Sequence, residues 1–219
     1  MKLLRLVPIL ALILLAACAP PRTAKDYTKF RSEDPASLLV VPVVNRTVDV
    51  TAADYFLSTL TMPVAERGYY VYPVFLVKRL LEDDGLADAA LVHSADPRRL
   101  GAIFGADAIL YVTINKWNAK YAVFSTSVEV EFDYVIKSGK TGEELWKSHE
   151  AMVYVPQSQN TGNAIGNLVA MAVTASMAKA SPNYMPLART ANHNAFWRDH
   201  QGLPAGPHLD QHGKDKEAF

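Results

Sequence analysis

The chain has 219 residues, half of them hydrophobic, which is enough for one domain with a sizeable buried core. Lysine and arginine together number 22, as do aspartate and glutamate, so the formal net charge is zero. Because there is no basic surplus to neutralise phosphates, nucleic-acid binding is not expected.

The N-terminal stretch has the parts of a secretory signal peptide. Two basic residues precede an apolar run over residues 6–17, which is too short to span a bilayer. Two alanines then lead directly to Cys18, the only cysteine in the sequence. This arrangement resembles the bacterial lipobox, in which the cysteine is lipidated and becomes the mature N-terminus. We therefore expect a signal peptide over residues 1–17 and a lipid on Cys18; the alternative is an ordinary signal peptide that contains a cysteine.

The residues after the cysteine bear on sorting and on the link to the body of the protein. Lipoproteins that this sequence resembles stay in the inner membrane when Asp follows the cysteine, whereas Ala19 stands here. The resemblance thus implies the outer membrane, and we expect the domain on its periplasmic face. Residues 18–36 are polar and are expected to form the anchor and a flexible tether, with Tyr27 and Phe30 able to dock on the body.

Residues 37–199 are predicted to form a single α/β domain. The β-branched run over residues 38–44 is typical of a strand buried on both faces, with Pro42 at its end or at a bulge. A capping box over residues 51–54 predicts the start of a helix that Pro63 kinks or splits.

Gly68 ends that helix, and a second strand follows over residues 69–73. The next helix is expected over residues 75–84, with Phe75, Leu76, Leu80 and Leu81 as its apolar positions. A third helix should begin at Asp96–Pro97, with Asp as the cap, and end at Gly105.

The apolar residues 108–114 predict a central strand, so that three strands alternate with helices as in an α/β sheet. After Trp117 one antiparallel hairpin is expected, with strands over residues 128–137 and 145–155. Pro186 opens a last helix toward Trp197, and an irregular tail occupies residues 200–219. The predicted fold is a mixed sheet of about five strands, a βαβαβ start followed by an antiparallel hairpin, packed with helices.

A helix predicted over residues 165–180 carries small residues at four-residue steps, namely Gly166, Ala170 and Thr174. Small side chains let two backbones approach closely, so these three residues are candidates for an interaction face. The alternative is a core helix lying on the sheet.

Three further sets of residues are candidates for chemical sites. Glu129, Glu131 and Asp133 lie on one strand face and are expected to be a solvated surface rather than paired catalytic carboxylates. Four histidines in the tail or just before it lack the regular spacing of metal ligands, so no metal site is expected there: His193, His200, His208 and His212. No serine lies in a Gly-x-Ser-x-Gly elbow, and no catalytic residue is predicted.

Residues 40–45, 105–110 and the turn at 141–143 resemble the fold of the curli-secretion lipoprotein and the TolB N-terminal-like domain. Residues 62–73, 105–107 and 202–215 resemble more closely the lipoprotein family known as domain of unknown function 799, typified by a neisserial surface-lipoprotein antigen. The resemblance implies an outer-membrane lipoprotein found beside a curli-secretion-type lipoprotein, with a role in transport or surface assembly.

No catalytic residue is established for that family, so only the lipidated cysteine carries over, onto Cys18. We expect a non-enzymatic protein without a cofactor that binds other envelope lipoproteins through an exposed strand edge, the small-residue helix and the tail. A homo-oligomer is one option. The alternatives are an activator of cell-wall peptidoglycan synthesis or a hydrolase acting on peptidoglycan, and a solute-binding lipoprotein with a large apolar pocket.

Overall fold

The structure is a computed structural model that describes residues 25–122, 125–154 and 184–219. Its elements in chain order are α2 (Thr28–Glu33), β1 (Ser37–Val40), β2 (Val44–Asn45), α3 (Ala52–Leu57), α4 (Thr61–Glu66), β3 (Tyr70–Val71), α5 (Val74–Asp83), α6 (Ala89–Ser94), α7 (Pro97–Phe104), β4 (Ala108–Ala122), β5 (Ser125–Ser138), β6 (Glu144–Tyr154) and α9 (Met185–Trp197).

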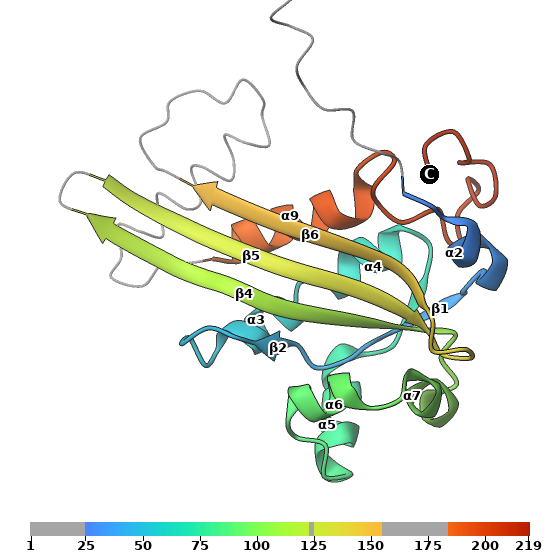
Figure 1. The fold of residues 1–219 in the computed structure, drawn as a ribbon, viewed down its shortest axis with the longest axis horizontal. Coiled ribbons are helices and arrows are strands. Elements are labelled where there is room, and N and C mark those ends of the chain that lie inside the picture. Colours follow the sequence, from blue (N-terminus) through green and yellow to red (C-terminus); the bar gives the residue numbers. More distant parts are fainter. Residues whose placement is uncertain (1–24, 123–124, 155–183) are drawn as a thin grey trace, which may run out of the picture.

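The strands form one six-stranded mixed sheet in the order β3-β1-β4-β5-β6, with β2 also paired to β4 (Figure 1). β1 lies parallel to β3 and β4, whereas β4, β5 and β6 are antiparallel neighbours. The predicted α/β fold with a mixed sheet is therefore confirmed. In the described parts of the chain, no helix combines the length and the hydrophobicity needed to cross a bilayer.

Alternating side chains of the central strands supply two separate cores. Leu38 and Val40 of β1 pack in the larger core with α3, α4 and α9, whereas Leu39 packs in the smaller core with α5, α6 and α7. Figure 1 shows α5, α6 and α7 together below the sheet. Since neighbouring residues of a strand point to opposite faces, β1 and the first half of β4 are covered on both sides, as predicted for apolar strands.

Pro42 divides the first predicted strand, as expected from its missing amide proton. The β-branched run becomes β1 and β2, which pair with β4 on either side of the proline. Pro63 was expected to kink or split the first helix, and the helical stretch is divided into α3 and α4.

The capping box predicted at Thr51 is wrong. Thr51 makes no side-chain cap bond to the helix; its hydroxyl donates to Asp49 Oδ1 at 2.7 Å, and its amide donates to the same atom. The Thr51 hydroxyl that a capping box requires is thus bonded to Asp49 instead, because a carboxylate two residues upstream forms a tight local turn. At Asp96 and Pro97 the predicted cap is confirmed, since Asp96 Oδ1 accepts the amide of Arg98 at 2.9 Å.

The predicted apolar face of α5 is mostly wrong. Val74, Val77 and Leu81 are the buried residues of this helix, whereas Phe75, Leu76 and Leu80 are 46–56% exposed. The spacing of the buried residues follows one helical face, and the other apolar residues fall on the opposite side. A further helix, α6, was not predicted; Asp88 caps it by accepting the amide of Ala90.

β4 runs well beyond its predicted end and forms a second hairpin with β5. The two strands stay paired from Ala108 and Ser138 to Ala122 and Ser125. Residues 116–121 alternate polar and apolar types, a period-two pattern that the prediction of a single hairpin after Trp117 overlooked. The predicted hairpin of β5 and β6 is confirmed, and the alternating residues of β5 from Val128 to Ile136 point into the core.

The first described residues and the tail pack against each other and against the body. Tyr27 and Phe30 are buried, as anticipated, and α2 is a helix that was not predicted. The tail lacks regular structure, yet Leu203 and Ala205 are buried. Residues 202–206 thus belong to the packed body, whereas most of residues 207–219 are exposed, and the contact role expected for the tail stays a prediction.

The segment before α5 and the tail meet in what we call the tail clasp, the contacts of Arg67, Gly68 and Tyr69 with residues 203–208. The amide of Gly206 donates to Arg67 O at 2.7 Å, and the hydroxyl of Tyr69 donates to Pro204 O at 2.7 Å. Arg67 itself is only 7% exposed, and its guanidinium also donates to Leu203 O. Two segments more than 130 residues apart are thereby joined through backbone atoms.

Asp107 lies directly before β4 and is hydrogen-bonded to the start of β1. Its carboxylate accepts the amides of Ala36 and Ser37 at 3.2 and 3.1 Å and the hydroxyl of Ser37 at 2.9 Å. Burial raises the pKa of Asp107, but these hydrogen bonds and nearby Lys140 outweigh it, so the pKa lies below its ordinary value. The position of this carboxylate helps to set where β1 meets β4.

We expect Asp107→Ala to lower the free energy of unfolding by about 1–3 kcal/mol, because the amides of Ala36 and Ser37 lose their acceptor. Because the pKa of Asp107 is lower in the folded state, its ionisation stabilises the protein above the ordinary carboxyl pKa. This stabilisation is lost as the pH falls through the folded-state pKa. Urea unfolding of the wild type and of Asp107→Asn between pH 2.5 and 6 would measure this loss of unfolding free energy at low pH. Equal acid dependence in the two proteins would contradict it.

Candidate functional site

Four residues predicted to matter, Cys18, Gly166, Ala170 and Thr174, lie outside the described residues. Their proposed roles in lipidation and interaction stay predictions. The described residues offer four further places to consider: the outer face of the sheet, the tail histidines, a pocket beside β6, and the outer surface of the helices below the sheet.

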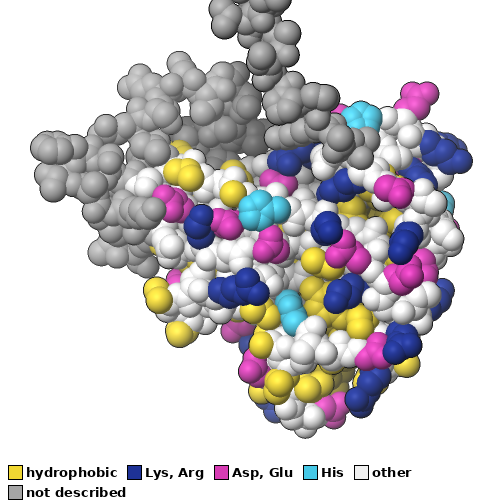
Figure 2. All heavy atoms as spheres, viewed as in Figure 1, with side chains coloured by type: hydrophobic (Ala, Val, Ile, Leu, Met, Phe, Trp, Pro, Cys, Tyr) yellow, Lys and Arg dark blue, Asp and Glu magenta, His cyan; other side chains and the backbone are white. Residues whose placement is uncertain are grey.

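The acidic side chains of β5 lie in a partly exposed polar network on the outer face of the sheet. Asp133 accepts hydrogen bonds from His149 Nδ1 at 2.7 Å and from Asn115 Nδ2 at 2.5 Å, while Glu131 pairs with Lys116 at 2.5 Å. Partial burial raises the pKa of Asp133, but the hydrogen bonds from His149 and Asn115 outweigh it and lower the pKa overall. Figure 2 shows acidic, basic and histidine side chains side by side across this face. The predicted solvated strand face is what the structure contains.

The Asp133–His149 pair resembles part of a hydrolytic triad but lacks the nucleophile. Ser148 is the adjacent serine, and its hydroxyl donates to Glu150 Oε1 at 3.4 Å on the opposite face of the strand. Within the parts of the chain that the structure describes, no hydroxyl group is hydrogen-bonded to a histidine. The pair is therefore arranged to hold the strands together and to present polar groups to solvent.

The tail histidines are dispersed. His208 and His212 bond through Nδ1 to the carbonyl oxygens of Gly68 and Ala205, and His193 stacks on Trp197. Among the residues that the structure covers, no three His, Cys, Asp or Glu side chains are grouped so as to hold a metal ion.

A buried ion pair lies on the inner face of β6, and the sequence reasoning missed it. Glu150 is 4% exposed and pairs with Arg198 through two parallel bonds of 2.9 Å, Nη1 to Oε1 and Nη2 to Oε2. The residues are 48 positions apart, on a strand and just after α9. Only the polar character of Glu150 at an inward-facing position of β6 could have indicated a buried partner.

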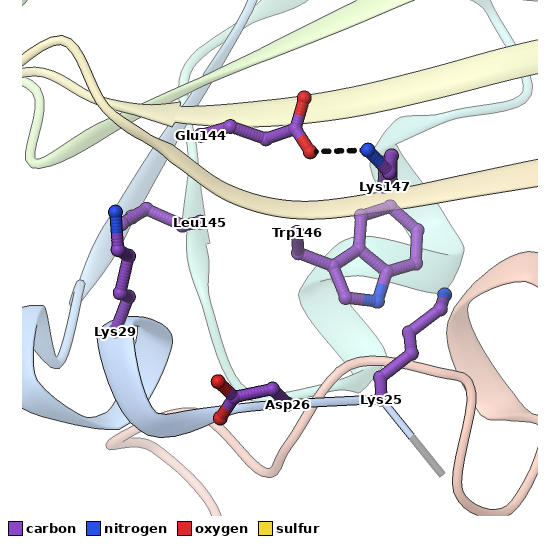
Figure 3. A pocket seen from close by; sticks show the side chains of 7 residues that line it. All are labelled: Lys25, Asp26, Lys29, Glu144, Leu145, Trp146 and Lys147. Carbon is purple, nitrogen blue, oxygen red and sulfur yellow. Dashed lines mark ion pairs between the residues drawn. The ribbon is translucent and has the colours of Figure 1, made fainter. Parts of the chain in front are cut away.

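A pocket of about 250 Å³ opens between the first described residues and the start of β6 (Figure 3). Lys25 extends from the N-terminal segment toward Trp146 of β6, and Lys29 of α2 stands beside Leu145. The ammonium group of Lys25 lies 4.5 Å from the centre of the Trp146 ring and donates to Gln201 O at 2.5 Å. The pocket thus has an aromatic wall and a cation at the point where the chain enters the body.

The outer surfaces of α5, α6 and α7 carry several exposed apolar side chains. Figure 2 shows hydrophobic side chains gathered over the lower part of the molecule, where these helices lie. Five large apolar residues there are 46–62% exposed: Phe75, Leu76, Leu80, Leu91 and Ile103. We call these five residues the apolar helix face. Exposed apolar residues on adjacent helices are typical of a surface that binds another molecule.

Comparison with known proteins shows that the chain is similar to bacterial lipoproteins. The chain is 31% identical over 199 residues to "Putative lipoprotein NMB1124/NMB1162" of Neisseria meningitidis serogroup B, covering 90% of this chain and 92% of that protein. The crystal structure of lipoprotein GNA1162 from N. meningitidis is 30% identical, with a TM-score of 0.55 over 66% of this chain and 99% of that chain. A PelC dodecamer from Paraburkholderia phytofirmans is a more distant match, 15% identical with a TM-score of 0.42, over 76% of this chain and 94% of that one.

The family relationship extends over most of the chain. Residues 25–208 match the family described as "Putative lipoprotein GNA1162-like", and this range includes every described strand and helix and the tail clasp. The resemblance to a lipoprotein family typified by a neisserial antigen is thereby confirmed. The chain belongs to the GNA1162-like lipoprotein family.

Proposed function

We propose that this protein is an outer-membrane lipoprotein, anchored through a lipid on Cys18 with its domain on the periplasmic face, and that it works without catalysis. It binds partner proteins, other envelope lipoproteins among them, in a transport or surface-assembly system. The observation that carries this proposal is the apolar helix face, which leaves five large apolar side chains exposed on α5, α6 and α7.

The position of this face relative to the proposed anchor favours a protein partner. The described chain begins at Lys25, near α9 and the tail, whereas α5, α6 and α7 lie at the opposite end of the molecule (Figure 1). With Cys18 in the membrane, the apolar helix face is directed away from the bilayer that holds the anchor. Its occupant is then a protein surface in the periplasm rather than the anchoring lipid layer.

The contacts of the outer sheet face support a binding role over hydrolysis of peptidoglycan. His149 and Asp133 are hydrogen-bonded to each other, and the neighbouring Ser148 points to the other side of β6. A Ser–His hydrolase needs the nucleophile within hydrogen-bonding reach of the base.

We expect a photo-crosslinking amino acid at Leu80 or Ile103 to capture another envelope lipoprotein in living cells. The matched control is the same amino acid at Lys147, an exposed position of β6 outside the apolar helix face. With the probe at Ile103, the double variant Leu76→Asp/Leu80→Asp should abolish the captured species, because two charges would have to be desolvated in the interface. Mass spectrometry identifies the partner. Identical adducts at Lys147 and Leu80, or capture that survives the double variant, would overturn the proposal.

A further inference from the structure

The pocket beside β6 contains a cation whose environment differs from that of its neighbours. Lys29 pairs with Glu143 at 2.8 Å, and Lys147 pairs with Glu144 at 2.8 Å. No described carboxylate lies within 4.0 Å of the Lys25 ammonium, whose contacts are Gln201 O and the ring of Trp146. Lys25 is thus a cation without a paired counter-ion at the edge of a pocket.

Burial makes that unpaired charge costly. Burial lowers the pKa of Lys25 to about 8, with Glu150 raising it and Arg198 lowering it to smaller extents. An ammonium group has three donors, of which Gln201 O takes one. An incoming anion would supply the missing counter-charge and would accept the remaining donors.

We infer that this pocket binds an anionic phosphate group, with Lys25 as its principal cation. Lys29 and Lys147 line the same pocket and add positive charge at its rim, against the carboxylates of Asp26 and Glu144. The volume of about 250 Å³ is sufficient for a phosphate with a small substituent but not for a large ligand.

The source of the phosphate follows from where the pocket lies in the sequence, and this step rests on the proposed lipid anchor at Cys18. Seven residue steps separate Cys18 from Lys25, which at full extension span at most about 25 Å. The pocket would therefore stay close to the bilayer, where headgroup phosphates are the most concentrated anions. A headgroup bound there would fix the orientation of the domain and keep the apolar helix face turned toward the periplasm.

The test uses the full-length lipidated protein in nonionic detergent, titrated calorimetrically with three probes: inorganic phosphate, glycerol 3-phosphate and dihexanoyl phosphatidylglycerol. We expect Lys25→Gln to weaken binding at least fivefold, Lys29→Gln about twofold, and Lys140→Gln, a lysine paired with Asp107 outside the pocket, not at all. Lys25→Arg should retain the affinity because it keeps the charge, which separates loss of the cation from loss of the fold.

The pH dependence of ligand binding gives a second readout. Between pH 7 and 9 the binding of dihexanoyl phosphatidylglycerol should weaken in the wild type, because Lys25 loses its proton near pH 8, but not in Lys25→Arg. The other charged groups around Lys25 are Glu150, Arg198, Asp26, Lys29 and the Glu144–Lys147 pair, and all of them are unchanged in Lys25→Arg.

The outcomes separate the sources of the phosphate. Equal affinity for all three probes means that the phosphate group alone is recognised, whereas binding of phosphatidylglycerol alone identifies a lipid headgroup. The inference would be overturned if Lys25→Gln bound the phosphate probes as tightly as the wild type does. It would also be overturned if an acidic peptide bound and none of the phosphate probes did. Lipidation is scored separately by palmitate labelling of the wild type and Cys18→Ser, so failure of the anchor is distinguishable from failure of the pocket.

Discussion

Arg198→Met is expected to lower the free energy of unfolding by about 3–5 kcal/mol, because it leaves the carboxylate of Glu150 buried without its partner. The two residues are joined by two bonds of 2.9 Å, and Glu150 is 4% exposed. Ser148 can offer Glu150 only one long bond of 3.4 Å, and Lys25 is engaged with Gln201 O. Neither replaces a bidentate guanidinium.

Removing the other partner should cost less. The side chain of Arg198 is 33% exposed, so in Glu150→Leu its guanidinium can turn toward water. The double variant Glu150→Leu/Arg198→Met should be close to the wild type in stability, since replacing a buried ion pair by apolar residues is often neutral. Urea unfolding of all four proteins forms a double-mutant cycle. If the two single variants cost the same, or the double variant costs their sum, the pair is not buried as the structure has it.

This pair shows where prediction from sequence stops. In β5 the alternation of apolar residues with Glu129, Glu131 and Asp133 is enough to assign the inward side chains from Val128 to Ile136, and those side chains are buried. In β6 residue types do not alternate, and only the two-residue period of a strand, counted from the buried Trp146, places Glu150 on the inward side. The sequence does not show that Arg198, beyond α9, reaches it. Local patterns predict which face a residue occupies; partners distant in the chain depend on the assembled fold.

The helices show the same division. Asp96, Pro97 and Gly105 define α7 through contacts within a few residues, so its ends were predictable. On α5 both sides carry apolar residues, and only the packing of the sheet decides that Val77 is buried while Leu80 is exposed. The apolar helix face therefore could not be assigned from periodicity.

The candidate phosphate pocket was equally beyond sequence reasoning. It combines a residue of the expected tether, Lys25, with Trp146 of a late strand and Gln201 of the tail. Each is unremarkable alone, and the stretch around Lys25 is polar enough to suggest a free tether.

The segments that carry the family resemblance acquire a physical role in the tail clasp. Residues 62–73 and 202–215 are linked in the sequence only by their resemblance to the family, yet in the structure they form one backbone-to-backbone contact. The amide of Gly206 donates to Arg67 O at 2.7 Å, and the amide of His208 donates to Gly68 O at 3.1 Å. Two backbone segments this close leave no room for a side chain between them.

We therefore expect Gly206→Ala to destabilise the protein by about 3 kcal/mol, since the added methyl group must push apart two backbones that are already bonded. A Cβ at Gly206 would lie 2.4 Å from Gly68 O and 2.6 Å from Gly68 C, well inside contact distance. The matched control is Gly213→Ala in the same tail, where nothing lies within 4 Å and only the positive φ of +70° opposes a side chain.

The control should cost about 1 kcal/mol, the strain of a left-handed conformation for alanine. Urea unfolding measures the difference, and limited proteolysis of the folded proteins reports whether the tail has separated: Gly206→Ala should be cut between α9 and residue 219 sooner than Gly213→Ala. If the two variants unfold at the same urea concentration, the backbones of Gly68 and Gly206 are not in contact. The tail would then have to be held by other contacts, such as the hydrogen bond that the guanidinium of the buried Arg67 donates to Leu203 O.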